Sequence, residues 1–415
     1  MGNNLNTGSK FYGYSVAVGC AIIVFLTQGA LGTFGVFFPY ILESEGYSPT
    51  AVSLMATCCS TVVFIINTMF YSIVKRLGAK RTMMLGIFFC GLHYVIYGLS
   101  TSILMIYVGA CFGGFSMGMA TNAITSLILT RWFVEKRDAV IGYAMLPMSF
   151  GGAAMSFISG QLCELVGWRN AYFVVAALLW IIGLPICAIF VKESPEKYGQ
   201  LPLGATEAVV DEIKAKDTSK LVEARTVGFW LMWIGLFLLC IINPGLSHNL
   251  SNVWRSVGIE PLAASNYTSI AKLLGALGFL AMGKYAEKIG GKGVTVFFGI
   301  SCCLAPIVLL QSGHGIVWVA LACIMYGLTY PSYHLTASYV TMDAYGRGRF
   351  ARVFGVLQGA AMWAGAFSSL VVNGIKEAAG STYALPMYIF AACGIVSMVL
   401  ILAGMNLARR GQAKA

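Results

Sequence analysis

Apolar runs of about 20 residues recur along almost the whole chain and limit its possible folds more than any other feature of the sequence. Such a run crosses the roughly 30 Å hydrocarbon core of a bilayer as one α-helix. Hydrophobic side chains make up 58% of the 415 residues and charged ones only 10%, which excludes a soluble domain of this size. We therefore predict an all-α membrane protein with twelve transmembrane helices. The predicted spans cover approximately residues 12–40, 50–74, 81–99, 103–130, 139–163, 170–191, 227–250, 262–282, 293–311, 316–341, 353–374 and 383–407.

A charged stretch, too polar to enter a membrane, separates the sixth predicted span from the seventh. Similar basic loops lie on its two sides, where Gly78 corresponds to Gly290 and Gly142 corresponds to Gly355. The spacing along the chain is nearly the same in both pairs, which indicates two copies of one six-helix unit with a substrate site at mid-depth between them. We predict two pseudo-symmetric six-helix halves, at residues 1–191 and 227–415, joined by a cytoplasmic linker at 192–226.

Lysine and arginine fall almost entirely on one side of the predicted membrane. If the N-terminus is cytoplasmic, the inner loops and termini hold 23 of the 27 basic residues. The outer loops then hold only Arg169, Arg255 and Lys376, and Lys272 remains inside a span. Because basic loops stay in the cytoplasm during insertion, we predict a multi-pass protein of the inner (cytoplasmic) membrane with both termini cytoplasmic. The net charge of +11 follows from this distribution and does not indicate a nucleic-acid partner.

Lys272 places a cation near the centre of the eighth predicted span. A lysine at that depth costs about 2.5 to 3.5 kcal/mol on insertion scales, so it persists where it faces a polar cavity, a partner or a ligand. No aspartate or glutamate lies in the deep part of any predicted span. We interpret Lys272 as the charge that binds an anionic substrate. The alternative is a neutral lysine whose amine is held by backbone or tyrosine oxygens.

The tenth predicted span is the richest in polar and aromatic residues. Its candidates for contact with a bound anion are Tyr326, Tyr330, Tyr333 and His334. Their spacing allows them to share one broad helix face, and we expect Pro331 to loosen the turn between them. Phenol hydroxyls can donate hydrogen bonds to a carboxylate. The alternative is an aromatic stripe that only packs.

Four further candidates lie on other spans. His248 follows Pro244 and Gly245 on span seven, where we expect the helix to break and to expose backbone groups. The alternative is a position at the outer membrane interface. The other three candidates are Asn122, Gln28 and Trp363. As alternatives, the amide side chains of Asn122 and Gln28 can join helices to one another by hydrogen bonds, and Trp363 can simply pack.

The loop after the eighth predicted span resembles the signature loop of the major facilitator superfamily. The signature is a glycine, an acidic residue four positions on, a basic residue, and a glycine with basic neighbours. Here it is matched by Gly283, Glu287, Lys288, Gly290 and Lys292. The resemblance implies that this loop latches the cytoplasmic side through charge pairing. The first copy carries Tyr71 and Lys75 at the first glycine and the acid, so we expect the second copy to hold the latch.

Longer segments resemble the monocarboxylate porters and oxalate-formate antiporters of that superfamily, among them TRWFVEKRDAVIGYA between spans four and five. Such porters usually carry an arginine in the eighth span, where this chain has Phe279. Lys272 lies seven residues earlier, close to two helical turns, so its charge keeps nearly the same face but moves about 10 Å outward. We infer a relocated cationic site. An ammonium in place of a forked guanidinium weakens the case for a dicarboxylate.

Together these features predict a secondary transporter, not an enzyme, that moves a small organic anion by alternating access. A monocarboxylate is the expected substrate, carried by exchange or by facilitated transport. Proton coupling would need a titrating group at mid-depth, and only a histidine or Lys272 itself is available. The alternatives are a carrier of larger sterol or aromatic acids, possibly proton-coupled through a histidine, and an anion-binding membrane sensor. Multidrug efflux is disfavoured because cationic drugs normally require an acidic pocket.

No cofactor is expected from the sequence. The twelve cysteines are scattered through apolar runs without metal-ligand spacing, and the phosphate-binding loop GxxxxGK[ST] is absent. We expect neither a metal nor ATP to take part. The only partners that we predict are the anion and the lipid bilayer.

Overall fold

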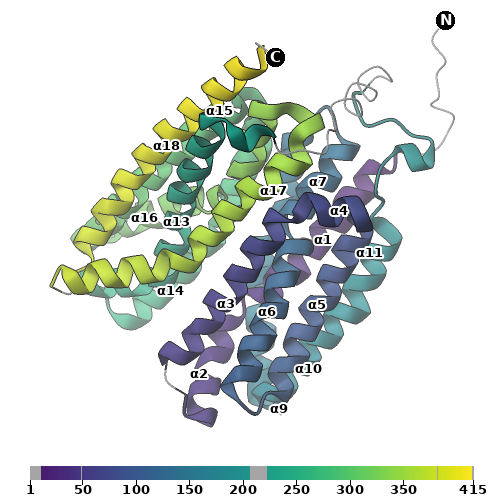
Figure 1. The fold of residues 1–415 in the computed structure, drawn as a ribbon. Helices are drawn as coiled ribbons and strands as arrows, with labels where there is room; N and C mark the ends of the chain where they lie inside the picture. Colours follow the sequence, from purple (N-terminus) through teal and green to yellow (C-terminus); the bar gives the residue numbers. More distant parts are fainter. Residues whose placement is uncertain (1–10, 48, 206–221, 381, 414–415) are drawn as a thin grey trace, which may run out of the picture.

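A computed structural model describes residues 11–47, 49–205, 222–380 and 382–413 of the chain. The fold consists of helices in two groups that lie side by side (Figure 1). The N-terminal group contains α1 (Gly13–Leu31), α2 (Phe34–Glu45), α3 (Pro49–Thr68), α4 (Phe70–Leu77), α5 (Ala79–Leu99), α6 (Ile103–Met119), α7 (Asn122–Trp132), α8 (Arg137–Met145), α9 (Pro147–Val166), α10 (Trp168–Leu178) and α11 (Leu184–Phe190). The C-terminal group contains α13 (Val227–Ser256), α14 (Pro261–Leu273), α15 (Gly275–Leu310), α16 (Ile316–Thr329), α17 (Ser332–Ala378) and α18 (Ala384–Ala413).

The described helices include 8 that are long and apolar enough to cross a membrane, or up to 10 if each of two bent helix pairs is counted as one span. The prediction of an all-α protein with many membrane-spanning helices is confirmed, and the number twelve stays a prediction. Two of the long helices pass through predicted loops. There, Gly290 in α15 and Gly346 in α17 have non-helical backbone angles, so each helix is kinked at the predicted loop.

The two predictions about helix breaks have different outcomes. The expected break at Pro244 is wrong, because α13 runs unbroken from Val227 to Ser256 with the proline inside. The loosening at Pro331 is confirmed, since α16 and α17 meet there at 41°. An unpredicted break at Met69 divides the second span into α3 and α4, whose axes meet at 65°. In the predicted linker, residues 206–221 lie outside the described residues, and the rest includes two short 3-10 turns, Glu196–Tyr198 and Val222–Arg225.

The two predicted copies of the repeat turn in the same way. Gly78, before α5, has φ 82° and ψ 154°, and Gly290, in the kink of α15, has φ 64° and ψ 179°. This combination of positive φ and extended ψ is accessible essentially only to glycine. Two glycines at corresponding places in the sequence therefore make equivalent turns, as two copies of one unit would.

Two seams join the helix groups, and each is built on a glycine. A Cβ added to Gly142 of α8 would lie 2.6 Å from the Cα of Gly283 in α15. A Cβ added to Gly355 of α17 would lie 2.7 Å from the carbonyl oxygen of Asn67 in α3. Gly142 and Gly355 are the second repeat-related pair found in the sequence. At both seams the backbones of two helices thus come into direct contact, which only a residue without a side chain permits.

Polar contacts reinforce the seams at the end of the bundle where α1 begins and α18 ends, which we name the termini end (Figure 1). The buried Arg137 donates from Nη2 to Ser338 Oγ at 3.0 Å. The Tyr339 hydroxyl donates to the Asp138 carbonyl oxygen at 3.1 Å. The two groups spread apart towards the opposite end, which we name the distal end (Figure 1). The bundle is therefore closed at its termini end in this structure.

The residues of the predicted latch surround this closed end. Gly283 forms the seam with Gly142, and Glu287 lies close enough to Arg137 for their charges to interact. The Lys292 backbone N–H donates to Asp343 Oδ2 at 3.2 Å. Gly290 makes the kink described above, and Lys288 is exposed. The latch function of these residues stays a prediction.

A carboxylate also caps the turn at Gly78 in the N-terminal group. Glu193 accepts from the Ala79 N–H at 3.2 Å, and it pairs with Lys197 at 2.5 Å and with Arg131 at 3.7 Å. Burial by itself would raise the pKa of Glu193, but Lys197, Ala79 and Arg131 outweigh it and hold the pKa below its ordinary value.

The lowered pKa of Glu193 predicts a pH-dependent contribution to stability. A carboxyl group whose folded-state pKa is lowered stabilises the fold above its unfolded pKa, and this contribution is lost as the pH falls through the folded value. We expect Glu193→Gln to lower the free energy of unfolding at neutral pH by about 1 kcal/mol or less, because the carboxylate is partly exposed. The difference from wild type should shrink as the pH falls below the ordinary value of 4.5. Thermal unfolding midpoints of the two proteins across this range measure it, and a pH-independent difference would contradict the prediction.

Candidate functional site

Two interrupted helices cross inside the C-terminal group. The junction of α14 and α15 packs against the junction of α16 and α17, through glycines on both sides. A Cβ added to Gly275 would lie 2.8 Å from the Tyr330 ring, and one added to Gly327 would lie 2.7 Å from the Leu274 carbonyl oxygen. Because these glycines have no side chains, the two helix breaks approach closely. The residues that flank the breaks therefore lie close together.

The aromatic and histidine residues predicted on span ten form a continuous row at this crossing. The ring centroids of Tyr326 and Tyr330 are 6.3 Å apart, and those of Tyr330 and His334 are 5.7 Å apart. Tyr333 meets His334 edge to face at 4.9 Å. Phe279 of α15 closes the group, 6.0 Å from Tyr330 and 6.2 Å from His334. These four candidates are therefore neighbours in space.

A hydrogen bond ties this row to the N-terminal group. The Nδ2 atom of Asn122, at the start of α7, lies 2.6 Å from Nδ1 of His334. Because an amide nitrogen only donates, the ring nitrogen accepts. The two residues are 212 residues apart, the same offset as Gly78 and Gly290, so they occupy related places in the two copies.

Three buried polar atoms of the candidate residues have no hydrogen-bond partner among the described residues. They are Asn122 Oδ1, Gln28 Nε2 and the Tyr326 hydroxyl oxygen. Buried polar groups in folded proteins are nearly always paired, so an unused donor or acceptor is a candidate contact for a ligand or a water molecule. Gln28 lies on α1. Among the described residues, its amide nitrogen makes no hydrogen bond to any of the other candidates.

Lys272 lies in the last turn of α14, three residues before the crossing at Gly275. It is exposed, and no described acidic residue pairs with it. His248 of α13 is also exposed and lies close enough to Lys272 for their charges to interact. Two polar groups of this kind would be costly against lipid. A position that faces the space between the helix groups, on the distal side of the crossing, would avoid this cost.

Trp363 belongs to a seam. Its ring stacks on Phe64 of the other helix group, with centroids 4.6 Å apart and planes 23° apart. Trp233 and Phe237 of α13 lie 6.4 and 6.1 Å from it. Trp363 thus forms part of an aromatic layer between the helix groups.

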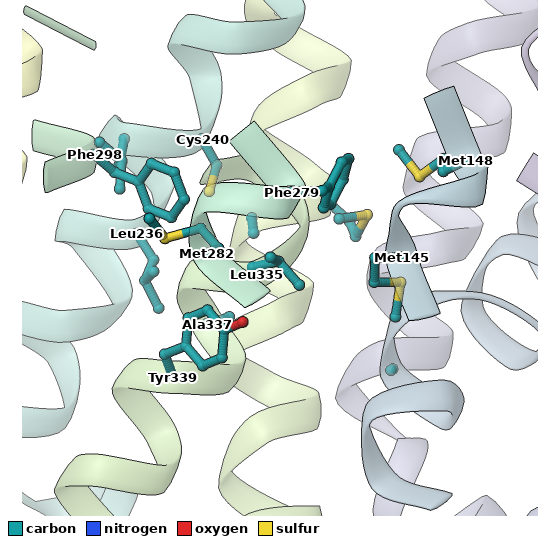
Figure 2. Close-up of a cluster of buried hydrophobic side chains, with 14 of the residues drawn as sticks. Met145, Met148, Leu236, Cys240, Phe279, Met282, Phe298, Leu335, Ala337 and Tyr339 are labelled. Carbon is teal, nitrogen blue, oxygen red and sulfur yellow. The ribbon is translucent and has the colours of Figure 1, made fainter. Parts of the chain in front are cut away.

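Sequence reasoning missed the central position of Phe279 at this crossing. In the sequence, this residue differs from its neighbours only in standing where similar porters usually carry an arginine. The side chain is fully buried, and Figure 2 shows it projecting towards the helices that carry Met145 and Met148 in the other group. The signal that could have indicated Phe279 was its position in the sequence, because a residue that replaces the usual arginine occupies the same place in the fold. Phe64 carried no such signal, because its role depends on Trp363, a partner from the other end of the sequence.

The Asn122–His334 hydrogen bond predicts an energetic coupling between the two side chains. Asn122→Leu or His334→Leu alone should lower the free energy of unfolding by about 1 to 3 kcal/mol, because each leaves a buried polar partner unpaired. The double substitution should cost less than the sum of the two, with a coupling of about 0.5 to 3 kcal/mol. A double-mutant cycle of chemical unfolding in detergent measures this. Additive effects would mean that the two side chains do not interact.

Comparisons with known proteins agree on one family. The family model described as Major Facilitator Superfamily matches residues 20–369. Monocarboxylate transporter 13 of Rattus norvegicus is 24% identical over 358 residues, which cover 84% of this chain and 78% of that protein. The uncharacterized transporter ESBP6 of Saccharomyces cerevisiae is 22% identical over 291 residues, which cover 69% of this chain but only 42% of the yeast protein.

Among solved structures, the proton:xylose symporter XylE, bound to 6-bromo-6-deoxy-D-glucose, superposes with a TM-score of 0.77. The superposition covers 97% of this chain and 99% of that one at 11% sequence identity. An identity this low supports a shared fold and carries no information about the substrate.

Proposed function

Since the chain belongs to the major facilitator superfamily and is a multi-pass membrane transporter, we propose that it carries a small organic anion, a monocarboxylate, by alternating access. The observation that carries the proposal is Lys272, an exposed cation without an acidic partner among the described residues, beside His248. A carboxylate is the ligand that completes such a site. The named relative, a monocarboxylate transporter, is consistent with this substrate class.

The proposed path of the anion runs between the two ends of the bundle. The anion enters at the distal end, where the helix groups are apart, and meets Lys272 first. One turn deeper, Tyr330 and His334 supply ring and hydroxyl groups, and Tyr326 lies beside them. Release on the other side requires the seams at Gly142 and Gly355 to separate while the distal ends close.

Lys272 also supplies a basis for exchange. The empty carrier holds an uncompensated charge between the helix groups, which opposes closure around it. The loaded carrier is neutral at this position and closes more easily. We therefore propose exchange or facilitated transport. Proton coupling would instead require His248, His334 or Lys272 itself to titrate during the cycle.

The orientation and the division into moving halves are part of the same proposal. Residues 1–191 and 227–415 would move as the two halves around the linker 192–226. The termini end would face the cytoplasm of a cell with this protein in its inner membrane, because the basic loops gather there. The structure would then represent a carrier that is open to the outside.

The test is uptake of radiolabelled compounds into proteoliposomes that contain the purified protein. The panel holds small monocarboxylates, dicarboxylates, the uncharged amides of the same acids, bulky aromatic acids and a lipophilic cation. We expect saturable uptake of small monocarboxylates and none of the amides. Equal uptake of acids and amides would refute an anion carrier, and binding without any uptake would indicate a sensor.

A second candidate function rests on the aromatic layer. Phe64, Trp363 and Phe237 are only partly buried and form apolar surface that a small acid would leave largely uncontacted. A larger amphipathic carboxylate, such as an aromatic acid or a sterol acid, would use this surface. In the same panel, uptake of bulky acids with small acids ignored would favour this second function.

A further inference from the structure

We propose that the N-terminal helix group binds the phosphate headgroup of an anionic phospholipid in a basic cavity at the termini end. The cavity has a volume of about 440 Å³ and forms where α4 ends, α5 begins and the chain leaves α11. Four of its lining side chains are basic and one is acidic. The polar lining consists of Arg76, Lys80, Arg81, Glu193, Lys197 and Tyr198.

Two of the basic side chains are free to bind a ligand. Lys197 pairs with Glu193 at 2.5 Å, and Lys80 Nζ donates to the Ala188 carbonyl oxygen at 2.5 Å. By contrast, Arg76 and Arg81 are exposed, and neither guanidinium has a hydrogen bond or ion pair within the described residues. A guanidinium presents a rigid fork of donors that matches phosphate oxygens. The cavity therefore offers two unused phosphate-binding groups.

The surface next to the cavity favours a lipid over a free phosphate. On α5, Leu85 and Phe88 follow Arg81 at i+4 and i+7, so the three residues share one helix face. Leu85 is 37% exposed and Phe88 43%, and Ile189 of the adjoining α11 is 60% exposed. A phosphate held by Arg81 thus lies at the head of an apolar strip, as a headgroup lies above its acyl chains. Basic pockets between transmembrane helices are known places for anionic headgroups.

The site is separate from the proposed transport path. The Lys80–Ala188 hydrogen bond and the Glu193 cap tie α5 to the end of α11 within the N-terminal group. A bound headgroup would add contacts to the same tie, so binding should stabilise this group against unfolding. Thermal unfolding of the full-length protein is therefore a direct readout of binding, independent of the substrate.

The experiment compares unfolding midpoints of the full chain in detergent with added phosphatidylglycerol, phosphatidylcholine or inorganic phosphate. For wild type we expect phosphatidylglycerol alone to raise the midpoint, with a saturable dose dependence. Arg76→Gln/Arg81→Gln should need roughly 10- to 30-fold more phosphatidylglycerol for the same rise, while it unfolds like wild type in phosphatidylcholine. The matched control is Lys284→Gln/Arg410→Gln, which removes two exposed basic residues from the C-terminal group and should respond as wild type does.

Three results would overturn the proposal. The first is an undiminished response of Arg76→Gln/Arg81→Gln, and the second is an equal loss of response in the control, which would indicate only general surface charge. The third is a full response to inorganic phosphate, which would make this a free-anion site. If Arg76→Gln/Arg81→Gln does not fold, Arg76→Lys/Arg81→Lys replaces it. This variant keeps the charges without the forks, so a weakened response is expected and an unchanged one would refute the guanidinium contacts.

Discussion

Replacing Lys272 by glutamine is expected to lower the rate of monocarboxylate uptake about 30- to 150-fold. The basis is the loss of a charge-assisted hydrogen bond to the carboxylate, worth roughly 2 to 3 kcal/mol. Glutamine keeps the length and hydrogen-bonding capacity of the side chain near those of lysine, so the charge is the main change. Lys272 is exposed and unpaired in the described structure, so folding should survive. The measurement is initial uptake at low substrate concentration, in proteoliposomes with matched amounts of protein.

Two variants control this prediction. Lys272→Arg keeps the charge and should retain most of the uptake. Lys284→Gln removes an exposed lysine at the termini end, whose Nζ lies 5.4 Å from the Tyr285 ring centroid, and should transport as wild type does. If Lys272→Gln transports at the wild-type rate, the anion is bound elsewhere, and the proposed substrate class loses its main support.

Adding one methyl group at Gly142 is expected to prevent normal closure of the termini end. A Cβ at Gly142 would lie 2.6 Å from the Gly283 Cα and 2.7 Å from its nitrogen, so α8 and α15 must move apart. Overpacking of this kind costs about 1 to 3 kcal/mol, which would shift the balance away from the closed termini end by roughly 5- to 150-fold. We expect Gly142→Ala to speed amide hydrogen exchange in α8 and around Gly283, and to slow transport.

Gly152→Ala is the matched control for this substitution. Gly152 lies on α9 of the same predicted span, and a Cβ there would meet nothing within 4 Å. Both variants make the same chemical change in a helix, and alanine favours the helix in both. If Gly142→Ala shows the same hydrogen exchange and transport as Gly152→Ala, the prediction is wrong, because the seam then tolerates separation without consequence.

The fold could be predicted from the sequence because its main determinant is local. Apolar runs of membrane length and their basic flanks can be read along the chain, and the matching loops around Gly78 and Gly290 report the repeat directly. The structure adds that these two glycines share one unusual backbone conformation. Asn122 and His334 are separated by the same number of residues as this glycine pair. The sequence pattern placed them on different predicted spans but did not relate them to each other.

The site could be predicted only in part, because it depends on how breaks in helices meet. Pro244 was expected to break a helix and did not, whereas Met69 broke one without any proline. In a packed bundle, neighbouring helices decide whether a proline bends its own helix. Tyr330 and His334 were found because they carry polar atoms in an apolar span. Phe279 and Phe64 were not, because a phenylalanine in such a span has no distinguishing feature until its neighbours are known.

Counterflow in proteoliposomes tests the central claim most directly. Vesicles are loaded with an unlabelled small monocarboxylate or left empty, and uptake of the labelled acid is followed for wild type and for Lys272→Gln. If Lys272 is the binding charge of an exchanger, internal substrate accelerates wild-type uptake strongly, and the variant shows little uptake under either condition. Equal acceleration in wild type and in Lys272→Gln would contradict the assignment of Lys272 as the substrate-binding charge.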